Sequence, residues 1–353
     1  MLDTNLIIGK KNTGKTRYIL FNEVKKAINN GENLCVFNTR DEYFKTFSNE
    51  LKDNNYNLIT LNLNDTTKSN GYNPLLVPYE LYKNNKFDEA ATLINDLALE
   101  LFKEDNPNVD PFWENMAANY FTGLVLILFK ENNIDKINLG SIQVMMSQCE
   151  EKTEDTTYLN KYLSNIDVTD IIYNMLSPIV FAPIETRGSI LSVAKQKLNL
   201  YLIREQLLNL LNTDEININK IPDKTAIIII ADKTRDIANI FIDQLIETSK
   251  LPFTYILDNF DALKVILSFN KLIDNASYNG NKVYVSVHNE EILKDKYGKY
   301  ILDKFDNIIN LNKNLEIINE YEEIEIGDNK DYPILEMKKH EYLNFIELME
   351  NKL

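Results

Sequence analysis

The sequence predicts an α/β fold in which an all-α domain interrupts a parallel core sheet. Strand-like and helix-like segments alternate through residues 1–89 and again through 212–353, which together predict one discontinuous domain. Between them, residues 90–211 have helical periodicity and almost no β-type run. The strand-like runs are continuously apolar, which is typical of parallel strands that helices cover on both faces.

The individual elements can be assigned in chain order. Seven short apolar runs predict strands, at residues 6–8, 34–37, 58–63, 226–231, 253–257, 283–287 and 308–311. Helical periodicity between strands predicts helices at 18–29, 42–52 and 238–249. In the middle domain, the same periodicity predicts helices at 90–102, 112–130, 139–149, 158–175 and 189–211. Because helices separate successive strands, we expect the strands to run parallel.

Composition and charge exclude several classes of protein. Hydrophobic residues make up 44% of the chain and aromatic residues 10%, which excludes a largely disordered protein. The net charge of -15 argues against a general nucleic-acid-coating role. The cysteines, Cys35 and Cys149, lack metal-ligand spacing, which indicates a reducing compartment. The longest apolar stretch, 116–129, is too short to span a membrane, so we expect a soluble, cytoplasmic chain.

A glycine-rich motif follows the first predicted strand and opens the first predicted helix. Its eight residues are Gly9, Lys10, Lys11, Asn12, Thr13, Gly14, Lys15 and Thr16, a complete G-x-x-x-x-G-K-T pattern. In such a loop, backbone N–H groups surround phosphate oxygens. Lys15 is expected to reach the β- and γ-phosphates, and the Thr16 hydroxyl to bind Mg²⁺. The alternative is a strand-to-helix turn that carries solvated lysines at positions 10 and 11.

A nucleotide site of this kind needs a carboxylate at the end of another core strand. Asp258 closes the apolar run at 253–257 and is our candidate for holding the metal with Thr16, although an ordinary turn aspartate is the alternative. The next residue is Asn259, where many P-loop ATPases have a glutamate that activates water. An amide can orient a water molecule but cannot take its proton.

Several further motifs occur in an order that resembles a known family. They are Val36-Phe37-Asn38-Thr39-Arg40-Asp41-Glu42-Tyr43, Leu61-Asn62-Leu63, Ser69, Tyr72-Asn73-Pro74-Leu75, Asp110-Pro111-Phe112-Trp113, Thr186-Arg187-Gly188-Ser189-Ile190-Leu191, Asp223-Lys224-Thr225-Ala226 and Tyr297-Gly298. From about residue 6 to 311, the chain is similar to the cytoplasmic ATPase part of the type IV secretion coupling proteins, the TraG/TraD type of conjugative DNA transfer ATPase.

This resemblance implies a RecA-like P-loop NTPase that uses ATP or ADP with Mg²⁺. It implies a homo-oligomeric ring, usually a hexamer, at the inner face of the cell membrane. Such a ring delivers single-stranded DNA with its relaxase, or protein cargo, to the proteins of a type IV secretion channel.

Three positions depart from the family pattern. Asn259 replaces the glutamate, His288 falls where a glutamine senses the γ-phosphate, and Ser277 falls, by spacing, near the position of an arginine finger. We therefore expect ATP turnover far below 1–10³ per second. The alternative to a coupling ATPase is a non-hydrolysing, nucleotide-binding adaptor that recruits cargo or partner proteins. His288 is then only a partly buried polar residue.

Two other features have alternative interpretations. Phe112, Trp113 and Tyr120 are suited to stacking on DNA bases, but the apolar segment around them favours a role in the helical core. The acidic residues between positions 316 and 328 predict a solvated edge strand or, alternatively, a site for a basic partner.

Overall fold

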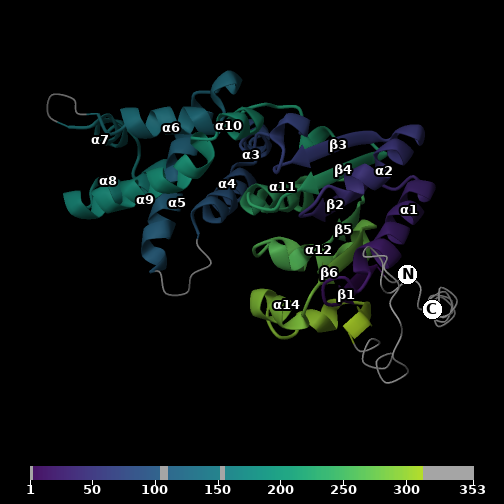
Figure 1. Cartoon of the computed structure of the whole chain (residues 1–353). Helices are drawn as coiled ribbons and strands as arrows, with labels where there is room; N and C mark the ends of the chain where they lie inside the picture. Colours follow the sequence, from purple (N-terminus) through teal and green to yellow (C-terminus); the bar gives the residue numbers. More distant parts are fainter. Residues whose placement is uncertain (1–2, 104–109, 152–155, 313–353) are drawn as a thin grey trace, which may run out of the picture.

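The computed structural model describes residues 3–103, 110–151 and 156–312, and these contain a seven-stranded sheet of order β3-β4-β2-β5-β6-β1-β7 (Figure 1). Its strands are β1 (Thr4–Ile8), β2 (Leu34–Asn38), β3 (Asn57–Asn62), β4 (Thr225–Ile230), β5 (Thr254–Leu257), β6 (Lys282–Val287) and β7 (Asn307–Asn310). All neighbouring strands are parallel. The predicted parallel α/β fold is confirmed, with every predicted run forming a strand. The acidic residues between 316 and 328 lie outside the described residues.

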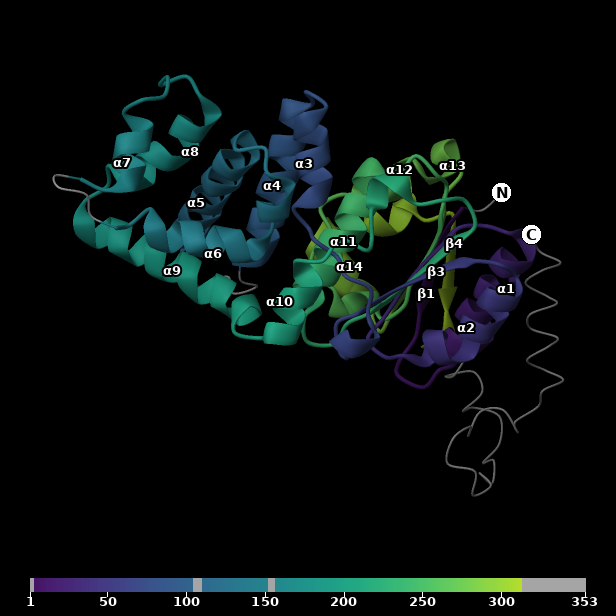
Figure 2. The same ribbon diagram turned by 90° about the horizontal axis from the view of Figure 1, so that it is seen from above.

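Alternate residues of the strands face two hydrophobic layers. Ile7, Val36 and Ile256 belong to a smaller core under α1 (Phe21–Asn30) and α2 (Glu42–Asp53). The next residue of each strand faces the opposite layer, which continues into the middle domain. Helices α11 (Arg235–Thr248), α12 (Phe269–Asp274), α13 (Ala276–Asn279) and α14 (Glu290–Tyr297) follow β4, β5 and β6. Figure 2 shows α1 and α2 on one side of the sheet, with α11, α12 and α14 on the other.

The middle of the chain forms a helical lobe beside the sheet (Figure 1). Its helices are α3 (Leu76–Lys83), α4 (Phe87–Phe102), α5 (Pro111–Lys130), α6 (Leu139–Gln148), α7 (Tyr158–Leu163), α8 (Ile171–Val180), α9 (Ile184–Leu202) and α10 (Glu205–Leu211). Helix α5 is buried on most sides and packs against α4, α6, α8 and α9. Gly123 allows α8 to come close, because a Cβ atom there would lie 2.4 Å from Leu176 Cγ.

Two predicted helices of this lobe are wrong as single helices. The segment 158–175 is divided between α7 and α8, because Asp170 caps a new helix by accepting a hydrogen bond from Ile172 N at 2.9 Å. The segment 189–211 is divided at Ile203, and α9 begins earlier than predicted. At that break, Arg204 Nη1 donates to Thr234 Oγ1 at 3.1 Å, which ties the lobe to the sheet domain.

Short helical turns complete the described structure. They are the π-helical turn η1 (Lys15–Leu20) and the 3₁₀ turns η2 (Thr66–Lys68), η3 (Ile134–Lys136), η4 (Ile218–Lys220), η5 (Phe260–Ala262) and η6 (Ile301–Lys304). Within the described parts of the chain, no helix combines the length and apolar character needed to cross a bilayer.

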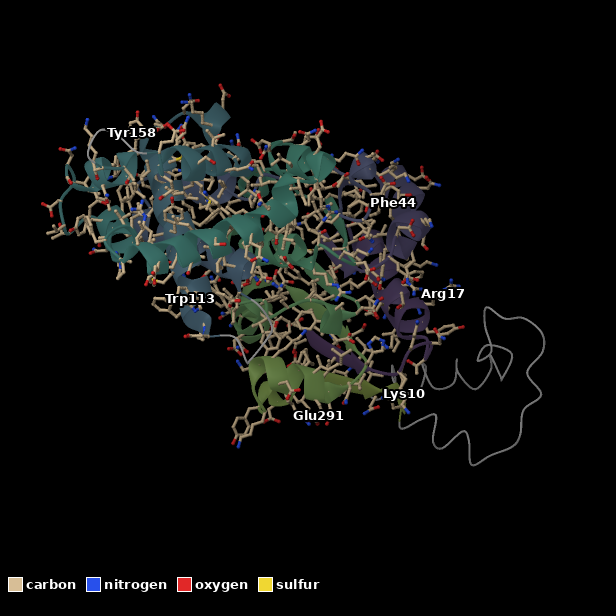
Figure 3. All side chains as sticks on the ribbon, turned by 60° about the vertical axis from the view of Figure 1, so that its left-hand side comes forward. Lys10, Arg17, Phe44, Trp113, Tyr158 and Glu291 are labelled. Atoms are coloured by element: carbon tan, nitrogen blue, oxygen red, sulfur yellow. The ribbon has the colours of Figure 1, made fainter. Side chains whose placement is uncertain are left out.

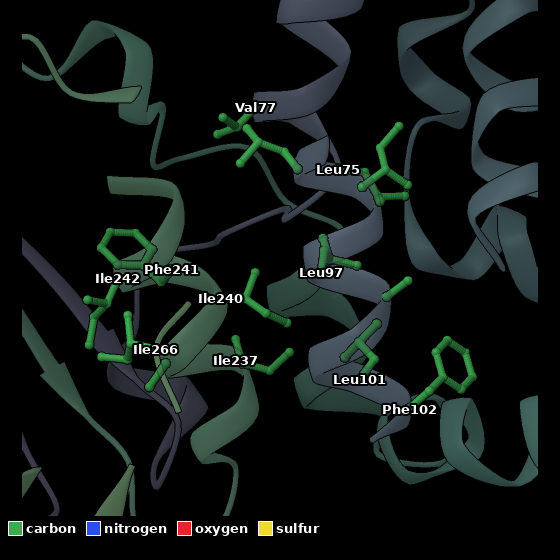
Figure 4. Close-up of a cluster of buried hydrophobic side chains, with 14 of the residues drawn as sticks. Leu75, Val77, Leu97, Leu101, Phe102, Ile237, Ile240, Phe241, Ile242 and Ile266 are labelled. Carbon is green, nitrogen blue, oxygen red and sulfur yellow. The ribbon is translucent and has the colours of Figure 1, made fainter. Parts of the chain in front are cut away.

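The lobe and the sheet share one hydrophobic core. Helix α4 lies against α11, and Figure 4 shows Leu97 and Leu101 of α4 on the side of Ile237 and Ile240 of α11. All four side chains are buried. This contact holds the lobe on the face of the sheet opposite to α1 and α2.

Candidate nucleotide-binding site

The glycine-rich loop connects β1 to η1 at the carboxyl edge of the sheet. Gly14 has a φ angle of +87°, and a Cβ atom there would lie 2.3 Å from Tyr18 Cδ2. A glycine is therefore required by both backbone conformation and space. Asn12 is also left-handed, with a φ of 67°. The loop thus has the tight, glycine-dependent turn that lets backbone N–H groups approach phosphate oxygens.

Lys15 is held inside this loop. Lys15 is only 6% exposed. Its Nζ atom donates to the carbonyl oxygen of Gly9 and, at 3.2 Å, to the carbonyl oxygen of Lys10. Burial lowers the pKa of Lys15, while the negative charges of Asp258 and Asp261 act in the opposite direction. Phosphate binding would exchange the loop carbonyls for phosphate oxygens as the acceptors of this ammonium group.

Thr16 and Asp258 meet although they are far apart in the sequence. Thr16 Oγ1 donates to Asp258 Oδ2 at 2.7 Å. Asp258 is 0% exposed, and all its other hydrogen-bond donors come from strand ends or the first turn after a strand. These donors are Asn38 Nδ2 at 3.2 Å, Tyr43 OH at 3.1 Å, Asn259 N at 2.9 Å and Ser286 Oγ. Burial and the neighbouring Asp258 charge raise the pKa of Tyr43 well above its usual value, so Tyr43 stays a donor.

Thr16 Oγ1 and the Asp258 carboxylate suit Mg²⁺ better than a metal ion that is coordinated by protein ligands alone. A hydroxyl and a carboxylate are the ligand types that Mg²⁺ uses together with phosphate oxygens and water. Among the described residues, no group of three or more histidine, cysteine, aspartate or glutamate side chains could hold a metal.

Asn259 lies next to this pair in a constrained conformation. Its φ and ψ angles are 54° and 46°, in the left-handed region that asparagine tolerates better than most residues. Asn259 Nδ2 donates to Asn38 Oδ1 at 3.1 Å. The amide is thus engaged with the end of β2, and it has no basic atom for taking a proton from water.

His288 follows β6, which lies between β5 and β1. The N–H of Gly9 donates to the carbonyl oxygen of Val287 at 3.0 Å, so His288 is placed beside the first residue of the loop. His288 Nδ1 contacts Asp261 Oδ2. Asn38 and Tyr43 belong to the motif that follows the second predicted strand, whereas Asp261 and Ser286 were not predicted, although each lies on or shortly after a strand that ends at this edge.

Of two further positions, Ser277 lies away from this edge in the single chain, whereas Arg235, at the start of α11, lies on it. Ser277 is exposed in α13, which precedes β6 and so lies toward the amino end of that strand. Arg235 Nη1 donates to the carbonyl oxygen of Ala262 at 3.1 Å, and its Nη2 contacts Asp232 Oδ1 at 3.1 Å. Arg235 therefore braces the segment that follows β5.

The remaining candidate side chains divide between the loop and the helical lobe. Lys10 and Lys11 are exposed. Figure 3 shows Lys10 and Trp113 at well-separated places on the molecule. Tyr120 is fully buried, Trp113 packs against the core, and Phe112 is more than one-third exposed. The aromatic group is thus mainly part of the lobe's core.

Comparisons with known proteins give a consistent result. The bacterial conjugative coupling protein TrwBΔN70 in complex with sulphate matches with a TM-score of 0.61 and 13% identity, covering 88% of this chain and 70% of that chain. The plasmid coupling protein TrwB in complex with ADP and Mg²⁺ matches with a TM-score of 0.61 and 12% identity, covering 87% and 70%. Its complex with a non-hydrolysable ATP analogue matches with a TM-score of 0.58 and 13% identity, over the same shares. At these identities, the likeness establishes a shared RecA-like α/β fold.

No curated protein sequence matches the chain. The sequence model for the family described as type IV secretory system conjugative DNA transfer matches residues 22–299. This match begins after the glycine-rich loop, so the loop is an observation independent of it. Because the match spans most of the chain, this protein belongs to the type IV secretory system conjugative DNA transfer family, the coupling proteins.

Proposed function

We propose that this chain is an ATP-binding coupling protein of a type IV secretion or conjugation system. In this proposal, Gly9–Thr16 bind the phosphates of ATP or ADP, and Lys15 contacts the β- and γ-phosphates. Thr16 and Asp258 hold Mg²⁺. The observation that carries the proposal is the 2.7 Å hydrogen bond between Thr16 and Asp258, which joins the loop to the end of β5.

Each protein group has a separate task in this site. Mg²⁺, when bound, neutralises charge on the phosphates. The loop N–H groups and Lys15 fix the phosphate chain. The donors around Asp258 keep its carboxylate oriented toward Thr16, since each of its oxygens accepts at least two hydrogen bonds. The relatives solved with ADP and Mg²⁺ and with an ATP analogue support the same ligands here.

The wider role follows from membership of the family. We propose that residues 1–89 and 212–353 form the nucleotide-binding domain and residues 90–211 an all-α domain. The chain would assemble as a homo-oligomeric ring at the cytoplasmic face of the membrane. It would deliver single-stranded DNA with a relaxase, or protein cargo, to the secretion channel.

A second candidate is a nucleotide-binding adaptor that does not hydrolyse ATP. Asn259 favours it, because the amide is engaged with Asn38 at 3.1 Å and cannot accept a proton. Both candidates require nucleotide binding, and they differ only in turnover and its coupling to cargo.

One pair of measurements separates these candidates. Calorimetric titration with Mg-ATP tests the site, and phosphate release with and without single-stranded DNA tests the motor at concentrations that promote oligomers. Binding with DNA-stimulated release supports the coupling ATPase. Binding without any release supports the adaptor, and an absence of binding contradicts both.

A further inference from the structure

We propose that Asp261 and His288 form a proton-accepting pair that replaces the missing glutamate in ATP hydrolysis. His288 is the catalytic base in this proposal, and Asp261 is a positioning residue that acts through it. The inference rests on the proposed function, because it requires Mg-ATP to bind at Gly9–Thr16. The inference differs from the expectation in the sequence analysis, where the asparagine at position 259 leaves the site without a base.

The strand order brings the pair to the loop. β6 lies directly between β5 and β1 in the sheet (Figure 1). Asp261 lies in η5, three residues after Asp258, and His288 is the first residue after β6. The hydrogen bond from Gly9 N to Val287 O, at 3.0 Å, fixes the end of β6 beside the start of the loop. The phosphate-binding loop and the pair thus share one edge of the sheet.

The surroundings of Asp261 hold its carboxylate against the imidazole. The Asp261 side chain is 15% exposed, and its Oδ2 contacts His288 Nδ1. Its other oxygen, Oδ1, is buried and has no hydrogen-bond partner among the described residues. Lys296 Nζ donates to the backbone carbonyls of Asp261, at 3.1 Å, and Leu263, which fixes the turn that carries the carboxylate.

Two lysines, Lys15 and Lys296, lie on either side of the Asp261–His288 pair. Lys15 on the loop is close enough for the charges of both Asp258 and Asp261 to act on its ammonium group. On the other side, Lys296 of α14 binds the backbone of the turn. A γ-phosphate held by Lys15 would lie at the same edge of the sheet as the pair, because Gly9 N is hydrogen-bonded to the end of β6.

The contact between Asp261 Oδ2 and His288 Nδ1 determines which imidazole nitrogen is available to accept a proton. When Asp261 accepts a hydrogen bond from Nδ1–H of His288, Nε2 keeps its lone pair and can accept a proton. The His288 side chain is 39% exposed, so water has access to it. A carboxylate that orients an imidazole in this way also stabilises the imidazolium that forms.

The chemical step is a hydrolysis with one proton transfer. His288 Nε2 takes a proton from water while the water oxygen forms a bond to the γ-phosphorus. The bond between that phosphorus and the bridging oxygen breaks, and its electron pair leaves with ADP. Inorganic phosphate is formed, and the proton on His288 passes to solvent. Asp261 accepts the hydrogen bond from Nδ1 throughout.

The test compares phosphate release and Mg-ATP affinity in four proteins. They are the wild type, His288→Ala, Asp261→Asn and, as a matched control, Asp295→Asn, which changes an exposed carboxylate on the neighbouring helix α14. We expect His288→Ala to lower kcat by about 10²-fold, the scale of general-base catalysis. Asp261→Asn should lower kcat by about 10-fold. Affinity should stay within about twofold of wild type in both, and Asp295→Asn should change neither quantity.

Two further measurements exclude a merely structural role. Added imidazole should restore part of the kcat of His288→Ala, because it can supply the missing base. In an Asn259→Glu background, His288→Ala should cost much less, because the glutamate then takes the proton. If His288→Ala does not fold, His288→Gln takes its place and should show the same loss of kcat.

The outcomes separate this inference from the proposed function. The pair is refuted if wild-type release stays at the spontaneous rate, if His288→Ala retains full kcat, or if imidazole gives no rescue. None of these results affects nucleotide binding. If wild-type protein fails to bind Mg-ATP, the proposed function itself is wrong.

Discussion

Two acidic regions of this protein give their carboxylates opposite surroundings. At the carboxyl edge of the sheet, Asp258 accepts hydrogen bonds from five donors. At the junction of α4 and α11, Asp96 lies beside Asp243 and Glu247, which carry the same charge. The first carboxylate is surrounded by donors, whereas Asp96 faces like charges.

The energetic consequence differs accordingly. Donors that converge on a charged oxygen compensate for its removal from water, which suits a group that must hold a cation. At the junction, burial raises the pKa of Asp96 to about 6, and the charges of Asp243 and Glu247 add to this effect. Burial also raises the pKa of Asp243, although Ser268 and Leu267 donate to it. The comparison teaches that two acids at partly or fully buried positions differ in how their charge is compensated: Asp258 by converging donors, whereas Asp96 faces two further acids.

The largest effect should come from adding a second carboxylate to the donor-rich region. Asn259→Glu supplies the general base of other P-loop ATPases, and in a His288→Ala background we expect it to raise phosphate release by about 10²-fold, because the proposed base is then absent. Because glutamate tolerates the left-handed conformation at position 259 less well than asparagine, this substitution should lower the free energy of unfolding by about 1 kcal/mol. Asn259→Gln is the matched control, since it has the same size but no basic oxygen. An equal rise in both variants would show that basicity is not the cause.

Next in size is the loss of the buried ammonium group. Lys15→Ala removes the side-chain charge directed at the phosphates and should weaken Mg-ATP binding by about 1.5–3 kcal/mol. Lys25→Ala, on the exposed face of α1, removes the same charge away from the loop and should have no effect. Calorimetric titration measures both. Unchanged affinity in Lys15→Ala would remove the basis for a nucleotide site.

Much of the site was predictable because its signals are local in the sequence. The loop from Gly9 to Thr16 is contiguous, and Asp258 directly follows an apolar run. The supporting side chains were not predictable in this way. Tyr43 and Ser286 reach Asp258 only because β2 and β6 both neighbour β5, and strand order is not written in any one segment.

The helical lobe shows a different limit of sequence reasoning. Apolar periodicity continues through residues 158–175, so a single helix was expected. Asp167 and Asp170 interrupt it by hydrogen bonding to backbone N–H groups at 2.8 and 2.9 Å. Such side-chain-to-backbone bonds compete with helix continuation, and their outcome depends on packing against α5.

A smaller effect should follow from removing one donor to Asp258. Tyr43→Phe deletes the hydrogen bond from Tyr43 OH, at 3.1 Å, to a buried carboxylate. We expect the free energy of unfolding to fall by about 1.5 kcal/mol, the lower end for bonds to charged groups, because other donors remain. Tyr56→Phe is the control, since its hydroxyl donates to neutral backbone carbonyls, such as Glu32 O at 2.9 Å. Urea denaturation should show the smaller loss for Tyr56→Phe, and the reverse order would contradict this account of Asp258.

The smallest effect should come from the donor-poor region. The folded protein holds the Asp96 proton more tightly than the unfolded chain, because the pKa is raised from 3.8 to about 6. The stability that Asp96 contributes is therefore fully present below about pH 4 and is lost as the pH rises through about 6.

Asp96→Asn removes this dependence, and we expect it to stabilise the protein at pH 7 by on the order of 1 kcal/mol, a value that allows for solvent screening of a partly buried group. Near pH 3, below the unfolded pKa of 3.8, the variant and the wild type should have nearly equal free energies of unfolding, because both then carry a neutral group at position 96. Urea denaturation at the two pH values measures the difference. A variant that is less stable than wild type at pH 7 would mean that Asp96 gains more from its partners, such as Lys271 at the same cavity, than it loses to Asp243 and Glu247. In that case, the contrast between the two acidic regions would not hold.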